Sequence, residues 1–271
     1  MQQTDQVLFE LWPPDPRIAV TRLNRPAQRN AVDTSLAVAL RAAVDRFEAD
    51  PALRVALLTG VGPVFCAGMD LAAFAAGERP GFGSDEGFAW FVHRARRKPI
   101  IAAVQGSALA GGFELMLACD LAVAAGSALF GLPEVRRGLI AAGGGSVRLP
   151  ARLPPAIARE MLLTGAPIGA ERALALGLVN AVVAAEEVEA AAGALASTIA
   201  DNAPAALAAT KRVCDAVTAA AEAAGWIAAA QAWAEIERSH DACEGALAFK
   251  EKRSPVWRGG LGTPTHPIQE D

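Results

Sequence analysis

Short apolar runs separated by glycine-containing turns fill the first two thirds of the chain. Residues 17–23 alternate between apolar and polar positions, which predicts a strand, and residues 54–59 form the continuous apolar run typical of a buried parallel strand. Asp33 is placed to cap a helix between them. The apolar positions of this helix are Leu36, Leu40, Val44 and Phe47. Strands that alternate with helices in this way predict an α/β fold built from parallel units.

A second set of elements follows the same rhythm. Residues 99–104 and 121–124 read as buried strands, with a helix from about residue 112 to residue 118 between them. Residues 60–68 are expected to form a loop that leads into a helix beginning at Asp70.

Beyond Pro150 the pattern becomes helical and rich in alanine, the strongest helix former. The expected helices are residues 156–163, 170–176, 186–200, 205–223, 226–238 and 242–252. We expect a boundary near Pro204, with an α/β core at residues 1–203 and a helical C-terminal module at residues 204–271. Helical ends coated with alanine often pack against another subunit, so this module is expected to serve oligomerisation.

Charge and composition narrow the functional classes. The net charge of −4 and the pI near 5.5 argue against nucleic acid or an anionic membrane as a partner. The first residues lack the pattern of a secretory signal, and the apolar stretches are interrupted, which argues against a membrane span. Four cysteines without a CxxC pair and three scattered histidines predict reduced thiols, a cytoplasmic location and no metal site.

One apolar segment, residues 99–133, contains only two charged residues, Glu114 and Asp120. A carboxylate inside a core is costly unless it is paired, hydrogen-bonded or protonated. Gly111 and Gly112 lie just before Glu114, near an expected helix start. Unpaired backbone N–H groups at such a start favour an anion. The segment therefore predicts a functional carboxyl group beside backbone donors.

A second glutamate, Glu134, lies among apolar neighbours after the next strand-like run. Two carboxyl groups beside exposed N–H donors suit acid–base chemistry next to a carbonyl that gains negative charge, although a lone glutamate is more often a solvated residue. Asp120 is expected to be structural and to accept backbone N–H groups. The glycine run at residues 143–146 fits neither a phosphate-binding loop nor a serine nucleophile motif, so it predicts neither.

Three blocks of the chain resemble the signature blocks of the crotonase (enoyl-CoA hydratase/isomerase) superfamily. They are residues 65–71, 106–120 and 130–138, in family order and spacing. Residues 25–31 are similar to the family's first CoA-facing loop, and residues 248–257 to its C-terminal helix. The resemblance implies the crotonase (ClpP/crotonase-like) fold, a spiral of repeated ββα units with a helical C-terminal module.

The resemblance also implies roles for single residues. The backbone N–H groups of Met69 and Gly111 would form the oxyanion hole for a thioester enolate. Glu114 and Glu134 would hold and deprotonate water and deliver a proton to the α-carbon. Relatives with other activities often keep one of these acids, whereas this chain has both. The implied reaction is addition of water across the 2,3 double bond of a 2-enoyl-CoA to give a 3-hydroxyacyl-CoA.

CoA enters as part of the substrate, and no further cofactor or metal is implied. The residues expected to bind the substrate and its CoA are Arg25, Arg29, Ala67, Gly68, Asp70, Leu71 and Gly112. On charge alone the arginines of this first loop, together with Arg22, suit CoA phosphates, and a solvated basic loop is the alternative. The expected partners are an acyl-CoA thioester and further copies of the chain, as a trimer or a dimer of trimers.

Several alternatives stay open at this stage. The chain could be a specialised member that acts on steroid or carnitinyl acyl groups, a Δ3–Δ2 enoyl-CoA isomerase, or a non-catalytic CoA-thioester-binding relative. Residues 77–87 contain four glycines and are followed by Phe88 and Trp90. This segment predicts a mobile wall of the acyl pocket that admits larger acyl groups, and a remote surface loop is its alternative.

Overall fold

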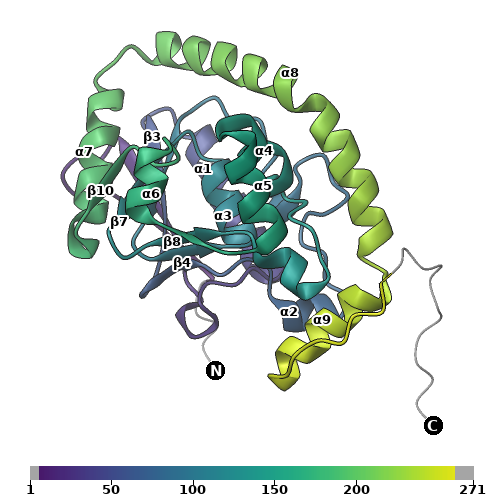
Figure 1. Cartoon of the computed structure of the whole chain (residues 1–271). Coiled ribbons are helices and arrows are strands. Elements are labelled where there is room, and N and C mark those ends of the chain that lie inside the picture. Colours follow the sequence, from purple (N-terminus) through teal and green to yellow (C-terminus); the bar gives the residue numbers. More distant parts are fainter. Residues whose placement is uncertain (1–5, 260–271) are drawn as a thin grey trace.

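The computed structural model describes residues 6–259 and places a central sheet of six strands at the core of the molecule (Figure 1). The sheet order is β1-β2-β3-β5-β7-β10. Its strands are β1 (Val7–Leu11), β2 (Ile18–Leu23), β3 (Val55–Gly60), β5 (Ile100–Val104), β7 (Leu121–Ala125) and β10 (Ala181–Val183). All neighbours are parallel except β1, which pairs antiparallel with β2. Every residue of β3 and β5 is buried, as continuous apolar runs predict for central parallel strands.

A second sheet of very short strands stands beside the first, in the order β4-β6-β8-β9. Its strands are β4 (Val64–Cys66), β6 (Ser107–Leu109), β8 (Leu129–Gly131) and β9 (Ile168–Gly169). The first three are parallel, and β9 pairs antiparallel with β8. The predicted loop at residues 60–68 therefore contains a strand. Runs of two or three residues are too short for hydrophobic periodicity to reveal.

Helices lead away from the carboxyl ends of both sheets. Asp33 accepts a hydrogen bond from the Leu36 N–H and caps α1 as predicted, and Asp70 caps α2 through the N–H groups of Ala72 and Ala73. The α-helices up to α7 are α1 (Thr34–Ala49), α2 (Leu71–Ala75), α3 (Gly111–Leu117), α4 (Gly145–Arg152), α5 (Pro155–Thr164), α6 (Ala170–Ala175) and α7 (Val188–Ala200). Short 3-10 helices are η1 (Pro26–Gln28), η2 (Phe88–Trp90), η3 (Pro133–Arg137) and η4 (Ala185–Glu187).

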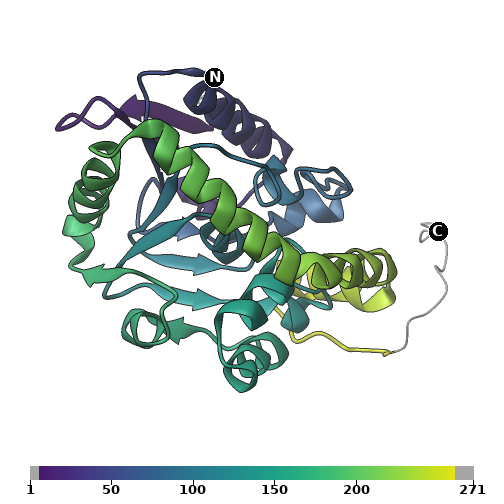
Figure 2. The same cartoon turned by 90° about the horizontal axis from the view of Figure 1, so that it is seen from above.

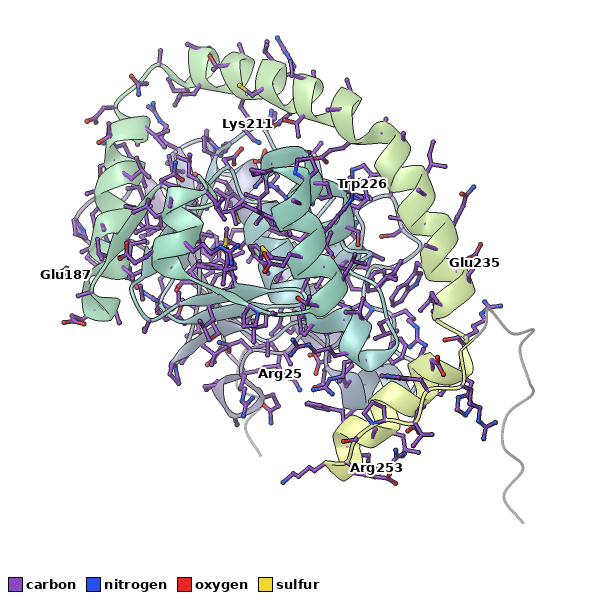
Figure 3. The ribbon with its side chains drawn as sticks, viewed as in Figure 1. Arg25, Glu187, Lys211, Trp226, Glu235 and Arg253 are labelled. Atoms are coloured by element: carbon purple, nitrogen blue, oxygen red, sulfur yellow. The ribbon has the colours of Figure 1, made fainter. Side chains whose placement is uncertain are left out.

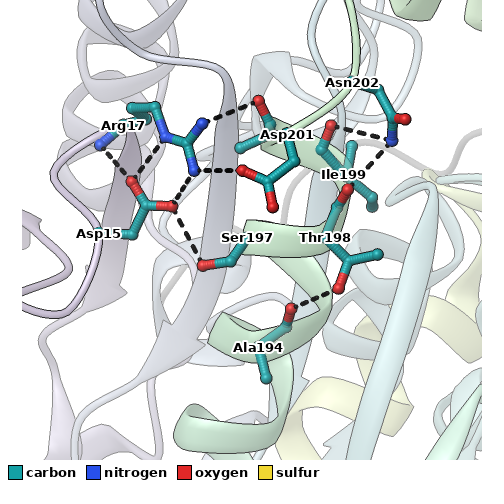
Figure 4. Close-up of polar contacts among 9 residues, drawn as sticks. Asp15, Arg17, Ala194, Ser197, Thr198, Ile199, Asp201 and Asn202 are labelled. Carbon is teal, nitrogen blue, oxygen red and sulfur yellow. Dashed lines mark hydrogen bonds and ion pairs between the residues drawn. The ribbon is translucent and has the colours of Figure 1, made fainter.

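A polar cluster fastens the end of α7 to the start of β2 (Figure 4). Arg17 forms a salt bridge of 2.7 Å with Asp15 and one of 2.8 Å with Asp201. Asp15 also accepts a hydrogen bond of 3.1 Å from the hydroxyl of Ser197. These partners lower the pKa of Asp15 to about 2, the hydrogen bonds from Arg17 being the main cause. The contacts hold α7 along the central strands, against which it packs.

The C-terminal part is formed by α8 (Pro204–Ile236) and α9 (His240–Glu251), and Figures 1 and 2 show α8 arching across the molecule. The prediction of two helices broken near Gly225 is wrong. A Cβ atom at position 225 would lie 3.0 Å from Cγ1 of Val147, so this glycine allows α8 to pass close over α4. Because α8 begins at Pro204, the predicted boundary falls at the start of a helix. The division into two domains stays a prediction. Residues 1–5 and 260–271 of the predicted domains lie outside the described part.

The outer face of α8 is apolar and exposed. Val213, Val217 and Ile227 are 62 %, 69 % and 64 % accessible. By length and composition alone α8 is long and apolar enough to cross a membrane, with a mean hydropathy of 1.3 over its best window, 11 % of which is buried. The sequence argument against a membrane span did not take account of this alanine-rich helix. An apolar stripe of this kind equally suits a face that another protein surface covers.

Candidate active site

The carboxyl ends of β4, β6 and β8 meet at one edge of the small sheet and bring the predicted chemistry together. β4 leads to Met69, β6 to Gly111 and Glu114 on α3, and β8 to Glu134 on η3. The pairs Cys66↔Ala108 and Leu109↔Gly131 set the register of these strands. Loops that leave parallel strands at the same edge are a common place for ligand sites in α/β proteins.

The backbone around Met69 leaves its N–H group free. Gly68 accepts a hydrogen bond of 2.8 Å from the Val32 N–H, and the Asp70 N–H donates one of 2.9 Å to the Val32 carbonyl. In this parallel bridge the N–H of the intervening Met69 points away from Val32. Within residues 6–259 it donates no hydrogen bond.

The second predicted donor lies beside the first. Gly111 is the first residue of α3, where N–H groups have no partner within the helix. A Cβ atom at position 68 would lie 2.8 Å from the Gly111 nitrogen, so the two loops are in contact. Ala110 directs the turn into α3 with a φ of +52°, a strained conformation for a residue other than glycine. The Gly111 N–H donates to no other residue of the described chain.

Glu114 is 3 % exposed and is held by the glycine run before α4. The Gly145 N–H donates a hydrogen bond of 2.9 Å to Oε1 of Glu114, and a Cβ atom at position 143 would lie 2.4 Å from Oε2. Burial raises the pKa of Glu114 to about 7, and the backbone of Gly145, the charge of Arg148 and the backbone of Gly143 limit the rise. The glycine run that matched no motif in the sequence therefore surrounds a carboxyl group.

Glu134 is in a different environment from Glu114. Its Oε2 atom is buried and has no hydrogen-bond partner in the described part of the chain. Burial, followed by repulsion from Glu114, raises the pKa of Glu134 well above its ordinary value. Because Glu114 accepts a backbone N–H while Oε2 of Glu134 has no partner, this geometry stabilises a negative charge better on Glu114 than on Glu134. The structure thus brings together the four residues predicted for catalysis.

Phe88, which directly follows the glycine-rich segment of residues 77–87, packs against the loops of the candidate site. A Cβ atom at Gly111 would lie 2.5 Å from Cε1 of Phe88, and one at Gly143 would lie 3.2 Å from Cβ of Phe88. Phe88 is 1 % exposed, and the next two residues, Ala89 and Trp90, have φ values of +57° and +49°. The segment of residues 77–87 therefore ends beside the site. Its mobility and its effect on substrate choice stay predictions.

The C-terminal helix α8 reaches the same segment. Phe82 stacks on Trp233 of α8 with ring centroids 4.3 Å apart, and Phe74 meets Trp233 edge-on at 6.3 Å. Arg79 lies over the Phe74 ring and pairs at 3.4 Å with Glu237, the residue that follows the last turn of α8. The α/β core and the C-terminal helix α8 therefore pack together beside the glycine-rich segment.

Two arginines of the predicted CoA loop are already engaged. Arg25, whose side chain is 15 % exposed, forms salt bridges of 3.1 Å with Asp33 and 3.2 Å with Asp70. Arg22 pairs through both guanidinium nitrogens with Glu189 on α7. Arg25 therefore fixes the loop through its partners, and the Asp70 carboxylate is used for capping and pairing.

The remaining predicted CoA residues lie along the same edge. Arg29 is exposed and forms no ion pair with another described residue, and its carbonyl accepts a 3.0 Å hydrogen bond from the Ala67 N–H. Leu71 begins α2. A Cβ atom at Gly112 would lie 2.2 Å from the Cys66 carbonyl oxygen, so this glycine is required for packing. Arg29 is the side chain of this loop that is free to meet a phosphate.

Two further observations concern metals and thiols. Within residues 6–259 no group of three or more His, Cys, Asp or Glu side chains is arranged to hold a metal ion. Cys66 and Cys119 are buried, and burial raises the pKa of each thiol to about 12, which keeps both protonated.

Comparison with known proteins decides the family. Residues 15–260 match the family model described as enoyl-CoA hydratase/isomerase. The chain belongs to this family, the crotonase family. The fold expected from the resemblance, an α/β crotonase fold with two mixed sheets and C-terminal helices, is confirmed.

Individual relatives are similar over nearly the whole chain. A carnitinyl-CoA dehydratase from Proteus mirabilis is 44 % identical over 245 residues, which cover 88 % of this chain and 93 % of the relative. The structure of a carnitinyl-CoA hydratase from Mycobacterium avium has a TM-score of 0.87 at 42 % identity, covering 94 % of this chain and 99 % of that one. An enoyl-CoA hydratase from Mycobacterium tuberculosis H37Rv has a TM-score of 0.74 at 46 % identity, covering 95 % of this chain and 100 % of that one.

Sequence reasoning missed several residues around the site. Gly143 and Gly145 were set aside because they fit no phosphate or nucleophile motif, although three consecutive glycines are themselves a sign of close backbone approach. Arg148 and Trp233 gave no signal, because their neighbours come from distant parts of the chain.

Proposed function

We propose that this crotonase is a hydro-lyase that adds water across the 2,3 double bond of a 2-enoyl-CoA thioester, and that also catalyses the reverse dehydration. The supporting observation is the pair of buried carboxyl groups with different environments. Glu114 is stabilised as an anion by a backbone N–H, and Glu134 lacks a partner at Oε2. A base and an acid poised side by side are what hydration requires.

Each carboxyl group has a distinct task in this reaction. The ionised Glu114 takes one proton from a bound water, whose oxygen forms a bond with C3 of the substrate. The π electrons of the double bond shift toward the thioester, and its carbonyl oxygen becomes an enolate. Protonated Glu134 then gives its proton to C2, which restores the carbonyl. The second proton of the water remains in the new hydroxyl group, so the reaction is balanced.

The two free N–H groups stabilise the intermediate in this proposal. Those of Met69 and Gly111 belong to adjoining loops and are directed by backbone that is already fixed. Preorganised donors of this kind stabilise an enolate oxygen without reorganisation during the reaction, and one donor is typically worth roughly 10²–10³ in rate. The exposed guanidinium of Arg29 suits a CoA phosphate. Addition of water involves no net oxidation or reduction, so the proposed steps use no redox cofactor, and CoA enters as part of the substrate.

A second candidate function is dehydration of carnitinyl-CoA, favoured by the 44 % identity with the Proteus mirabilis protein. Its acyl group carries a trimethylammonium group, which aromatic faces bind well. The aromatic cluster beside the site is already occupied, because Arg79 covers Phe74 while Phe82 and Trp233 stack on each other. This cluster is not a preformed cage for a quaternary ammonium, which supports the uncharged enoyl substrate as the first choice.

Turnover measurements on a substrate panel test the proposal. Purified protein is mixed with crotonyl-CoA, with longer and branched 2-enoyl-CoA thioesters, and with crotonobetainyl-CoA, and kcat/KM is measured from loss of the conjugated double bond. The Glu114→Gln/Glu134→Gln double variant is the control for background hydration. We expect the uncharged thioesters to give the higher kcat/KM. Preference for crotonobetainyl-CoA would assign the second function, and binding without turnover of any thioester would assign a CoA-binding role.

We also propose a cytoplasmic homo-oligomer, a trimer or a dimer of trimers. The exposed apolar positions Val213, Val217 and Ile227 of α8 support an assembly that covers this helix. The cytoplasmic location is supported by the four cysteines, all of which are free thiols.

A further inference from the structure

An arginine lies directly behind the glycine run that holds Glu114. Arg148 is on α4, and its side chain is 12 % exposed. Its Nη2 donates a 2.6 Å hydrogen bond to the Val92 carbonyl, in the stretch that follows η2. A Cβ atom at Gly144 would lie 2.5 Å from Nη1 of Arg148, and Nη1 is buried with no hydrogen-bond partner in residues 6–259. The guanidinium thus lies against the backbone between Gly143 and Gly145.

The group that faces Arg148 comes from the C-terminal helix. Glu222 of α8 is 4 % exposed, and its Oε2 lies 3.7 Å from Nε of Arg148. The same Oε2 accepts a 3.1 Å hydrogen bond from the indole N–H of Trp226, whose ring lies 4.9 Å from the guanidinium carbon. Figure 3 shows Trp226 on α8 where the helix passes α4. A carboxylate, an indole and a guanidinium are therefore packed together behind the catalytic pair.

We propose that Arg148 is a positioning residue for Glu114, that it places the glycine run around the carboxylate and supplies positive charge behind it, and that Glu222 of α8 holds and moderates that charge. The inference rests on the proposed role of Glu114 as the base. It deepens that role, because it makes the C-terminal helix part of the control of the base although α8 supplies neither of the two catalytic carboxyl groups.

Electrostatics gives the expected direction of each effect. The positive charge of Arg148 favours the ionised form of Glu114, and Glu222 opposes this by neutralising part of that charge. The other charged groups that act on Arg148 are Arg96 and Arg152, which disfavour its charge. His93 also faces this cluster, because its ring lies 3.8 Å from the ring of Trp226, and burial, followed by the charge of Arg148, lowers its pKa. The charged group that acts on Glu134 is Glu114 itself. Removing the arginine and removing its carboxylate should therefore shift the ionisation of Glu114 in opposite directions.

Three variants test the inference, with the acid limb of the kcat/KM–pH profile as the readout. Arg148→Met removes the charge and keeps the apolar stem, Arg148→Lys keeps the charge, and Glu222→Gln keeps the shape and can still accept the indole N–H. Glu160→Gln and Arg172→Met, at an exposed salt bridge between α5 and α6, are the matched controls.

We expect Arg148→Met to move the acid limb to higher pH by about one unit, and Glu222→Gln to move it to lower pH by a smaller amount. Arg148→Lys and the controls should stay near the wild-type limb. If the contact between Arg148 and Glu222 only holds α4 and α8 together, Arg148→Met and Glu222→Gln would both lower activity and thermal stability. The acid limbs of their pH profiles would then not move in opposite directions. Shifts in the same direction, or none in either variant, would overturn the inference. If Arg148→Met does not fold, the direction of the Glu222→Gln shift decides alone.

A readout that does not require turnover separates this inference from the proposed reaction. The carboxyl band of Glu114 can be followed against pH by infrared difference spectroscopy and assigned by its loss in Glu114→Gln. The same opposite shifts are expected in this band. Inactive protein with shifted bands would contradict the proposed reaction and keep the positioning role, whereas active protein with unshifted bands would remove the positioning role alone.

Discussion

Gly143 and Glu114 are in such close contact that a Cβ atom at position 143 would lie 2.4 Å from Oε2 of the glutamate. The glycine at this position is therefore a requirement of the carboxyl group and not of the turn, because its φ is not in the left-handed region. The relationship connects a loop that sequence motifs do not explain with the residue proposed to activate water.

Replacement of that glycine is the first prediction. Gly143→Ala should displace the Glu114 carboxylate, the flexible partner in the contact, and lower kcat by about 10²-fold, since a misplacement near 1 Å can cost that much. Gly169→Ala is the control, because nothing lies within 4 Å of a Cβ atom there. Steady-state kinetics and thermal unfolding of both variants check this. A Gly143→Ala enzyme with wild-type kcat would show that the contact does not position Glu114.

The carboxyl pair provides a second prediction. Glu114→Gln and Glu134→Gln should each lower kcat by roughly 10²–10⁴, the range for general acid–base groups. If both act on one water, the double variant should lose far less than the product of the two effects. CoA binding, measured by calorimetry, should hardly change. Wild-type turnover in either single variant would contradict the hydratase assignment.

The pKa of Glu114 gives a prediction about stability and pH. Burial raises the pKa of Glu114 from 4.5 to about 7 on folding, and the Glu134→Gln background leaves Glu114 as the only carboxyl group of the pair that titrates. A raised pKa means that the folded state binds the proton more tightly than the unfolded chain does. The contribution of protonated Glu114 to the free energy of unfolding is therefore complete below pH 4.5 and is lost as the pH rises through 7. Further replacement by Glu114→Gln should therefore stabilise the protein above pH 7, by roughly 3 kcal/mol at most.

Chemical denaturation at several pH values measures this difference. The Glu114→Gln gain should shrink as the pH falls from 7 to 4.5 and should vanish below that. A gain that does not depend on pH would show that Glu114 is not held protonated by burial.

Substrate range is the subject of the fourth prediction. Phe82 and Trp233 stack 4.3 Å apart beside Phe88, and Phe88 contacts Gly111. Phe82→Ala and Trp90→Ala should raise kcat/KM for long or branched acyl groups relative to crotonyl-CoA, with discrimination of about 1–3 kcal/mol per methylene at most. We also expect medium or bulky substrates to be used by the wild type at least as well as crotonyl-CoA. Equal loss with every substrate would exclude this segment as a wall of the acyl pocket.

The fifth prediction concerns α8. If its apolar face packs against another copy, light scattering should give several times the 27.9 kDa of one chain, and Val217→Glu should lower that mass. Lys211→Ala would test the interface less clearly, because the Lys211 amine pairs with Asp120 within the same chain. Partition of the wild type into lipid vesicles, with a monomer in solution, would favour the membrane alternative that the length and hydropathy of α8 admit.

Sequence reasoning succeeded where an element is long or its chemistry is local. The cap at Asp33 was predicted from the long apolar periodicity of the helix that follows it, and the buried strands β3 and β5 from their continuous apolar runs. Asp120 was predicted as structural, and it accepts the Ile100 N–H at 2.8 Å. The placement of Glu114 in the core followed from its apolar neighbours.

The remainder depends on contacts between distant segments. The small sheet escaped prediction because two or three residues have no measurable period, although it is this sheet that brings Met69, Gly111 and Glu134 together. The predicted helices 205–223 and 226–238 are one helix, and the contact of Gly225 with Val147, which the sequence does not show, explains why a glycine stands inside it. The pairing of Arg25 with Asp33 and Asp70 could not be predicted either, because tertiary structure decides which arginines are paired, and its contact with CoA stays a prediction.

The position of α8 also matters for the order in which the protein is made. During translation Glu222 and Trp233 are synthesised after Arg148, Phe82 and both proposed catalytic glutamates. Until then the nascent core holds a guanidinium without its counter-charge and an aromatic wall without its stacking partner. A chain that stops before α8 would contain both proposed catalytic carboxyl groups and both N–H donors, yet it would lack the groups that complete their surroundings.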